Sequence, residues 1–296
     1  MRVLITGSAG ATGTEMLAYL RSIGEAEVIG TARDDCDLTD YAATVSMVRR
    51  ADPQAVIHLA AKANVAQSFL HSRTFMENNI IGTDNLLRAI YTLKIHPRVL
   101  MVSSCEVYGD IPFPVDERAG HAPANPYAVS KCGQEHLGMM AWRIYRLPVI
   151  ISRLFNTINP RREDLFSSAF ARQVARIEAR KQATLFHGNL DTSRCVMDVR
   201  DVVSAYWHLL KRGEPGEAYN VGTNQETSVR EFLNLLTSKA KCVIPRAVDD
   251  SLMRPLDIRK QVPYLTKFNA LGWKARYTLS DSIEYLLAYW REREVA

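Results

Sequence analysis

The apolar positions in the first half of the chain fall into two alternating patterns. Short continuous apolar runs flanked by turn residues are typical of strands buried on both faces of a parallel sheet, and they predict strands at residues 3–6, 27–31, 55–60, 99–103 and 149–153. Apolar positions at helical spacing predict helices at residues 10–22, 41–51, 72–93 and 126–145. The sequence therefore predicts an α/β fold with a doubly wound parallel sheet.

After residue 156 the pattern becomes mixed. Helices are predicted at residues 167–180, 229–240 and 279–291. Phe170, Val174 and Ile177 recur at helical spacing in the first of these, and we interpret them as core positions. This half predicts a smaller α/β lobe.

Three glycines connect the first predicted strand to the first predicted helix. Gly7 permits a tight turn, Gly10 lets the backbone approach a pyrophosphate, and Gly13 lets the helix pack closely on the sheet. The start of that helix offers N–H groups and the positive end of a dipole to phosphates. The segment predicts a dinucleotide site.

Two further strands end in residues that suit such a site. The run from Ala55 ends in Leu59, Ala60 and Ala61, where small side chains leave room for a cofactor to lie across the strand end. His58 lies inside that run, and we interpret it as a packed core histidine. The strand at 99–103 is followed by Ser104, at the edge where ligands bind in open parallel sheets.

Tyr127 and Lys131 are separated by three residues, which places a phenol and an ammonium on one face of one helix. We expect Lys131 to lower the pKa of the phenol, so that Tyr127 exchanges a proton with a carbinol or carbonyl near neutral pH. Ser104 is placed to hydrogen-bond the same oxygen. The pair alone is a weak signal, but it occurs together with the glycine turn and the two strand ends.

Taken together, these motifs resemble the extended short-chain dehydrogenase/reductase family, in its branch that works on nucleotide sugars. The resemblance spans nearly the whole chain, through motifs at residues 7–13, 58–61, 79–83, 103–109, 127–131, 153–156, 198–203, 219–222 and 254–257. One departure is Ala11-Thr12, where the family usually has an aromatic or aliphatic pair.

The resemblance implies an organisation and a set of roles. Residues 1–156 are expected to form the NADP-binding domain and residues 157–296 most of the substrate lobe, with an approximate boundary because the chain crosses back. The implied catalytic residues are Ser104, Tyr127, Lys131 and Glu106. The implied cofactor contacts are Gly7, Gly10, Ala11, Thr12, Gly13, Asp37, Leu38, Leu59, Ala60, Ala61, Tyr127 and Lys131.

The end of the second strand bears on the choice of cofactor. Enzymes that use NAD usually carry an acidic residue there, to hold the ribose 2′-hydroxyl. Here Ala32 takes that position and Arg33 follows. Because a guanidinium suits a 2′-phosphate, the sequence favours NADP(H) over NAD(H), although Arg33 is also open to interpretation as a merely exposed side chain.

The resemblance also implies a nucleotide-diphosphate sugar as substrate, GDP-linked by similarity to the enzymes that handle GDP-mannose. Asn156, Arg194 and Arg254 match positions that hold the diphosphate. The remaining expected substrate contacts are Cys105, Glu106, Arg161 and Asp257.

Reductase and dehydratase remain alternatives at this point. Dehydratases of this branch have a Thr followed by Asp or Ser and then Glu, whereas this chain has Ser104-Cys105-Glu106, and its link from Arg33 to Asp37 is short. The Cys105 thiol is a weak hydrogen-bond donor and a poor substitute for the Asp or Ser of a dehydratase. This difference and the short link favour a reductase that acts on a 4-keto-6-deoxy sugar. Pro160-Arg161-Arg162 is dehydratase-like. A 4-epimerase comes third, and a non-catalytic NADP sensor or scaffold last.

Composition adds exclusions. The 296 residues are 47% hydrophobic, which is typical of a globular protein, and a net charge of +5 without a dense basic tract does not indicate nucleic-acid binding. We expect no membrane segment and no metal. The five scattered cysteines favour a reducing cytoplasm. The family resemblance implies a homodimer, with Leu137, Met139, Met140 and Trp142 as candidate apolar contacts.

Overall fold

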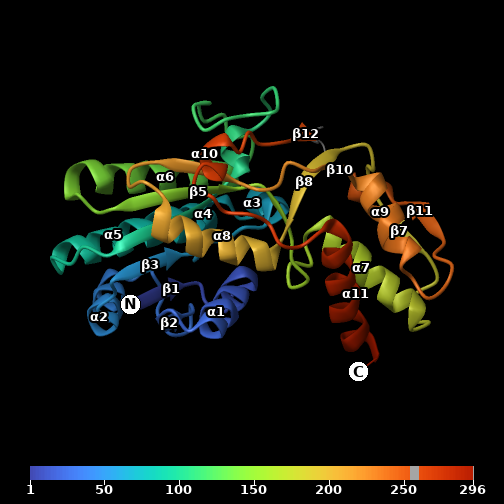
Figure 1. The fold of residues 1–296 in the computed structure, drawn as a ribbon, viewed down its shortest axis with the longest axis horizontal. Coiled ribbons are helices and arrows are strands. Elements are labelled where there is room, and N and C mark those ends of the chain that lie inside the picture. Colours follow the sequence, from blue (N-terminus) through green and yellow to red (C-terminus); the bar gives the residue numbers. More distant parts are fainter. Residues whose placement is uncertain (254–259, 296) are drawn as a thin grey trace.

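The computed structural model describes residues 1–253 and 260–295, and a six-stranded parallel sheet organises most of it (Figure 1). The strand order is β2-β1-β3-β4-β5-β9. The strands are β1 (Arg2–Thr6), β2 (Glu27–Thr31), β3 (Ala55–His58), β4 (Arg98–Ser104), β5 (Val149–Leu154) and β9 (Ala218–Val221). The prediction of a doubly wound parallel sheet is confirmed. Because the order reverses beside β1, the carboxyl ends of β1 and β3 frame a crevice.

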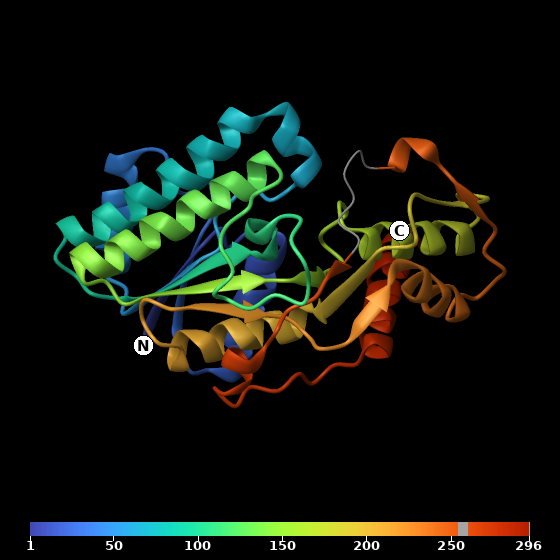
Figure 2. The same ribbon diagram turned by 90° about the horizontal axis from the view of Figure 1, so that it is seen from above.

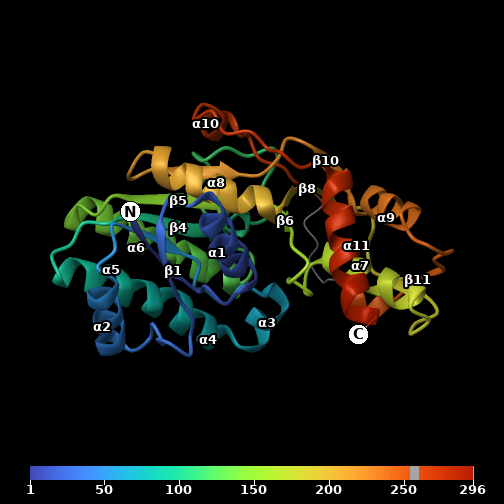
Figure 3. The same cartoon turned by 60° about the horizontal axis from the view of Figure 1, so that its bottom comes forward.

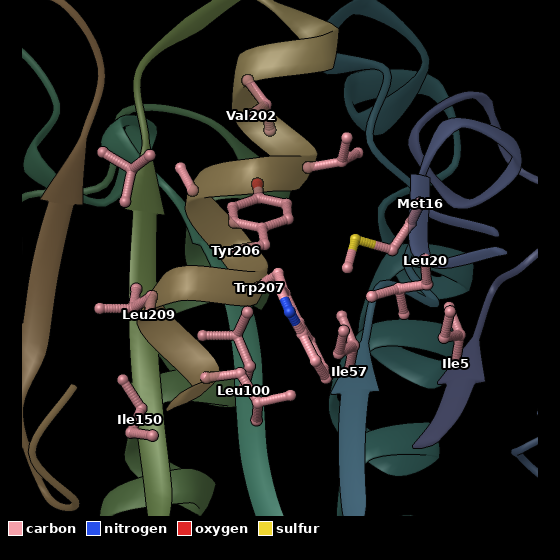
Figure 4. Close-up of a cluster of buried hydrophobic side chains, with 14 of the residues drawn as sticks. Ile5, Met16, Leu20, Ile57, Leu100, Ile150, Val202, Tyr206, Trp207 and Leu209 are labelled. Carbon is pink, nitrogen blue, oxygen red and sulfur yellow. The ribbon is translucent and has the colours of Figure 1, made fainter. Parts of the chain in front are cut away.

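Helices cover both faces of this sheet, as Figure 3 shows. On one face lie α1 (Ala11–Ile23) and α8 (Val199–Arg212), and on the other lie α2 (Tyr41–Ala51), α5 (Gly82–Thr92) and α6 (Pro126–Tyr145). The sequence did not predict α8. Its Tyr206 and Leu209 lie over Leu100 and Ile150 of the strands, in the core drawn in Figure 4. Helix α8 therefore completes the first face from a distant part of the sequence.

The helix predicted at residues 72–93 is interrupted. It consists of α4 (Ser72–Met76), a π-helical segment η1 (Glu77–Ile81) and α5, and is preceded by α3 (Val65–Leu70). The wider π turn presents Asn79, whose side chain accepts from Lys62 N at 2.8 Å and donates to Ser130 Oγ at 2.8 Å. Segments of this kind are frequent near functional sites. Here the segment ties the end of β3 to α6.

The second lobe lies at one end of the sheet (Figure 2). Its strands are β6 (Asn156–Ile158), β8 (Ser193–Asp198), β10 (Glu226–Ser228) and β12 (Lys260–Gln261), with β7 (Leu185–His187) and β11 (Arg246–Val248) forming a separate pair. Helices α7 (Phe166–Glu178), α9 (Val229–Ser238) and α11 (Leu279–Val295) share one core, which contains Phe170, Val174 and Ile177 as predicted. The short elements are η2 (Cys105–Tyr108), η3 (Asp250–Leu252) and α10 (Thr266–Asn269).

The chain crosses between the lobes more than once. After β8 it returns to the large sheet as α8 and β9, and α10 packs against β9. It then re-enters the second lobe as α11, which lies along α7. Residues after 156 therefore contribute to both lobes.

Candidate active site

The glycine turn after β1 is closed by backbone contacts. Gly7 has φ +72°, and a Cβ there would lie 2.8 Å from Ala60 Cα. A Cβ on Gly13 would lie 2.2 Å from Gly7 O. Side chains are excluded at both positions, which lets α1 begin directly over the turn, with Gly10 as its N-cap and Ala11, Thr12 and Gly13 in its first turn.

A cavity of about 320 Å³ opens beside this turn. Eight residues expected to bind the cofactor line it, namely Gly7, Gly10, Arg33, Asp37, Leu38, Leu59, Ala60 and Ala61. Lys62 and Asn78 also line it and were not predicted. We call this lining the cofactor cradle. Its close backbone at one end and its cationic rim at the other fit a dinucleotide.

Arg33 forms the rim of the cradle. Its side chain is 60% exposed, donates to Asp37 Oδ2 at 3.1 Å and reaches Asn78 Oδ1 at 3.3 Å. Asp37 is in turn fixed by the N–H and hydroxyl of Thr39, and these hydrogen bonds lower the pKa of its carboxyl. An exposed pair of this kind is weak, so the guanidinium is free to turn toward a phosphate.

Helix α6 carries the predicted catalytic pair. Its N-cap Asn125 accepts from Ala128 N at 2.8 Å, and Pro126 occupies the first turn, so the helix start is well defined. Tyr127 and Lys131 are both buried, and the ammonium lies 6.0 Å from the centre of the phenol ring. Together with Ser104 we call them the catalytic floor.

The electrostatics of the floor differ from the sequence prediction. Burial raises the pKa of Tyr127 to about 12, opposed by a hydrogen bond with Ser104 and by the charge of Arg162. The prediction that the pKa of Tyr127 is lowered toward neutrality is wrong in this structure, because desolvation outweighs the interactions that lower it. The raised pKa favours the protonated phenol at neutral pH.

Lys131 is itself perturbed. Its ammonium donates to Val102 O at 2.8 Å and to Gln134 Oε1 at 2.7 Å. Burial lowers the pKa of Lys131 to about 7, and the charge of Glu135 opposes this shift. His58 is neutral, because burial lowers its pKa to about 3, which agrees with its interpretation as a core histidine.

The segment after β4 begins directly after Ser104 of the catalytic floor. Ser104 caps η2 by accepting from Glu106 N at 3.3 Å. Glu106 accepts from Asn125 Nδ2 at 2.9 Å and from Gln261 Nε2 at 3.0 Å. Asn156 donates to Gln261 Oε1 at 3.2 Å. Glu106 and Asn156 are thus brought together by Gln261, which no sequence signal indicated, whereas Asn125 directly precedes the helix predicted at 126–145.

Of the other residues expected to bind substrate, some lie near the catalytic floor and one points elsewhere. Cys105 is buried, which raises the pKa of its thiol, and Arg194 lies close enough for its charge to oppose this. Arg161 instead contacts Glu15 of α1 at 3.2 Å, while its neighbour Arg162 lies near Tyr127. Arg254 and Asp257 lie outside the described residues.

A buried ionic cluster lies behind the floor. Arg153 donates to Glu135 Oε2 at 2.8 Å, His121 contacts the same oxygen at 3.0 Å, and Ser103 donates to Oε1 at 2.5 Å. Burial alone raises the pKa of Glu135, but these hydrogen bonds and the charge of Arg153 lower it to about 2. Hydrogen bonds with Cys132 and Glu135 raise the pKa of His121 to about 9. The cluster ties α6 to β4, β5 and the loop after η2.

The sheet order, the glycine turn and the Ser-Tyr-Lys set define an extended short-chain dehydrogenase/reductase. The family model described as GDP-mannose 4,6 dehydratase matches residues 34–286, and the chain belongs to this family. The chain is therefore an enzyme of a family whose members act on nucleotide sugars.

Individual relatives narrow the comparison. The chain is 33% identical to the GDP-6-deoxy-D-mannose reductase of Pseudomonas aeruginosa, over 99% of this chain and 98% of the relative. The solved structure of RMD from Pseudomonas aeruginosa complexed with NADPH matches with a TM-score of 0.90 and 32% identity, over 99% of this chain and 100% of the other. The UDP-glucose 4-epimerase of Thermus thermophilus, in complex with NAD, matches with a TM-score of 0.86 and 27% identity, over 98% and 99%.

Residues 1–253 and 260–295 contain neither a helix with the length and apolar character needed to span a membrane nor a group of three or more potential metal ligands.

Proposed function

We propose that the protein reduces the C4 carbonyl of a GDP-linked 4-keto-6-deoxy sugar with NADPH. The observation that carries the proposal is the buried Tyr127, whose pKa is raised by burial, beside Ser104 and Lys131. Asn79 joins Lys62 of the cofactor cradle to Ser130 of the same helix. A keto reduction consumes a proton at the substrate oxygen, so a phenol that holds its proton at neutral pH suits the reductive direction. The similarity to a GDP-6-deoxy-D-mannose reductase supports the same direction.

Each floor residue has one task in this proposal. A bound NADPH supplies the hydride. Ser104 hydrogen-bonds the substrate carbonyl and Tyr127 gives its proton to O4. Lys131 holds its positive charge beside Tyr127, which favours the phenolate left after that transfer.

The two residues that follow Ser104 favour reduction over dehydration. Glu106 is the residue available to remove a proton from carbon, but both of its oxygens already accept amide hydrogens. Cys105 is a buried thiol of raised pKa, which makes it a poor acid for expelling a hydroxyl. We assign Cys105, Glu106, Asn156 and Arg194 to sugar and diphosphate binding. Arg254 and Asp257 are candidates for the same task on sequence grounds alone.

We assign NADP(H) as the preferred cofactor because of the rim of the cradle. Arg33 supplies an exposed guanidinium there, and Ala32 supplies no carboxylate. The relative solved with NADPH supports this choice.

The dehydratase is the second candidate, favoured by the family match and by a glutamate at the end of β4. One pair of incubations separates the candidates: GDP-mannose with the protein, and the 4-keto-6-deoxy derivative with the protein and NADPH. Stoichiometric loss of NADPH in the second means reductase. Product in the first without net cofactor consumption means dehydratase. If neither sugar changes while NADPH binds, the protein is a sensor or scaffold.

We further propose a homodimer through the outer faces of α5 and α6. Leu137 and Met139 are partly buried and pack against the monomer core, so we place the contact on more exposed residues. The large apolar residues exposed on η1, α5 and α6 are Ile81, Tyr91, Val129 and Ile144. Ile144→Asp is expected to shift the mass measured by light scattering from dimer to monomer. A monomeric wild type would refute the proposal.

The proposed compartment is a reducing cytoplasm. All five cysteines are free thiols in the structure, and four of them are buried. Thiols of this kind persist where disulfides are not formed.

A further inference from the structure

Gln134 lies one helical turn after Lys131 and contacts its ammonium directly. The Lys131 ammonium makes two hydrogen bonds within the described residues, to Val102 O and to Gln134 Oε1. The first acceptor is a fixed carbonyl of β4. The second is a side chain, so its position depends on what holds it.

A chain of buried hydrogen bonds holds the Gln134 amide. Its Nε2 donates to Thr83 Oγ1 at 2.6 Å, and the Thr83 hydroxyl donates to Asn79 O at 2.6 Å. Thr83 Oγ1 also lies 2.8 Å from His58 Nε2, and His58 Nδ1 lies 2.7 Å from Thr6 Oγ1. The side chains in this chain of hydrogen bonds are all buried, each at most 4% exposed: Thr6, His58, Thr83, Lys131 and Gln134.

The directions of these bonds are mutually consistent. The Thr83 hydroxyl donates its one hydrogen to Asn79 O. The Thr83 oxygen therefore acts as an acceptor for the N–H groups of Gln134 and His58. A neutral His58 carries one ring N–H, which is then on Nε2, and its Nδ1 accepts from the Thr6 hydroxyl. With this tautomer the 3.4 Å approach of Gln134 Nε2 to His58 Nε2 is a contact and not a hydrogen bond. The amide of Gln134 therefore has one orientation, with its oxygen toward Lys131. The flipped amide would set two donors against each other.

We propose that Gln134 is the positioning residue of Lys131: its amide oxygen, aimed by the Thr83–His58 chain, fixes the ammonium at the catalytic floor. The inference rests on the proposed function only for its effect on turnover. A neutral acceptor holds the ammonium without neutralising it, so the charge stays available to Tyr127. A glutamine that merely filled space would not influence how Lys131 titrates.

The charged and titratable groups that face Lys131 are few. Glu135 on α6 favours the protonated ammonium, while Tyr127 on α6 and His58 on β3 are neutral at pH 7. Burial places the pKa of Lys131 at about 7, where a change in one partner moves it visibly. The titration midpoint of Lys131 therefore reports directly on a change in Gln134.

The test is an NMR titration of protein labelled at the lysine ε-carbon, with Lys131 assigned by its loss in Lys131→Met. Gln134→Met removes the acceptor and is expected to move the Lys131 midpoint down by about one pH unit, and Gln134→Glu to move it up by about one to three. Thr83→Val frees the amide and should move the midpoint in the same direction as Gln134→Met. Urea midpoints identify any variant that does not fold.

The matched control is Gln173→Met in the second lobe. Gln173 makes comparable bonds, accepting from Phe186 N at 2.8 Å and donating to Phe186 O at 3.0 Å, far from Lys131 in the fold. It should leave the Lys131 midpoint unchanged. Unchanged midpoints in both folded Gln134 variants would overturn the inference, even if the protein reduces no sugar. If reduction is observed, the alkaline limb of kcat/KM should move with the NMR midpoint.

Discussion

The cofactor cradle and the catalytic floor are adjacent, but main-chain atoms shape the first and buried side chains shape the second. The glycine turn of the cradle is backbone: Gly7 lines the cavity and Gly13 packs on the turn, and a Cβ at either position meets main-chain atoms. The floor consists of buried polar side chains from β4 and α6, such as Tyr127 and Lys131, which depend on further buried side chains for their positions. Changes to the cradle should alter cofactor binding, and changes to the floor should alter chemistry.

The largest expected effect separates the two regions. Tyr127→Phe removes the proton donor of the floor and leaves the cradle intact. We expect kcat to fall by roughly 10²–10⁴ while the NADPH dissociation constant changes little, as measured by steady-state kinetics and fluorescence titration. Tyr145→Phe, near the end of the same helix, is the control. A Tyr127→Phe variant with near-normal turnover would remove the proton donor from the proposal.

The same contrast explains what the sequence could predict. The glycine turn of the cradle follows one continuous strand, turn and helix, so the spacing of Gly7, Gly10 and Gly13 was sufficient to predict that turn. Tyr127 and Lys131 share one helix, so their spacing was readable too. The contacts of Glu106 next to the floor were not readable, because Gln261 reaches it from 155 positions away in the chain. Long-range contacts between ordinary polar residues leave no local pattern.

The pKa of Tyr127 and the direction of the nearby arginines could not be predicted from the sequence either. The expectation that Lys131 lowers the pKa of Tyr127 considered only a nearby cation, whereas in the folded protein burial outweighs it. The sequence paired Arg161 with the substrate, but the turn after β6 directs Arg161 toward Glu15 and places Arg162 near the phenol. Burial and turn direction are properties of the fold.

The next effect concerns the support of the floor. Glu135→Gln leaves the buried Arg153 without its anion, and the expected loss in the free energy of unfolding is about 3–5 kcal/mol, measured by urea denaturation at pH 7. Glu163→Gln breaks an exposed pair with Arg172 and should cost about 0–1 kcal/mol. Equal losses in the two variants would show that burial does not set the strength of the cluster.

The cluster also predicts how stability depends on pH. The folded pKa of Glu135 is about 2, below its value in the unfolded chain, so its contribution is present above pH 4.5 and lost as pH falls toward 2. The folded pKa of His121 is about 9, so its contribution is present below pH 6.5 and lost as pH rises through 9. His121→Ala should flatten the alkaline side of the curve of unfolding midpoint against pH. An unchanged alkaline side would mean that His121 does not titrate with folding.

A smaller effect is expected in the cradle. Gly13→Ala places a Cβ 2.2 Å from Gly7 O, and relief of that contact shifts the turn away from α1. We expect a cost of about 1–3 kcal/mol, seen as weaker NADPH binding with little change in kcat at saturating cofactor. Gly120→Ala is the control, because nothing lies within 4 Å of the added atom. A large fall in kcat with unchanged NADPH affinity would contradict the division between cradle and floor.

The smallest effect tests the rim of the cradle. Arg33→Ala removes the guanidinium that we assign to the 2′-phosphate, and NADPH should then bind about tenfold more weakly, or about 1.4 kcal/mol. NADH lacks that phosphate, so its affinity should stay within about twofold. Arg50→Ala, an exposed arginine at the end of α2, controls for the change in net charge. Parallel titrations of both cofactors at two salt concentrations distinguish a direct contact from a long-range field, because the latter is screened. Equal losses for NADPH and NADH would show that Arg33 does not read the phosphate, and the preference for NADP(H) would then need another source in the cradle.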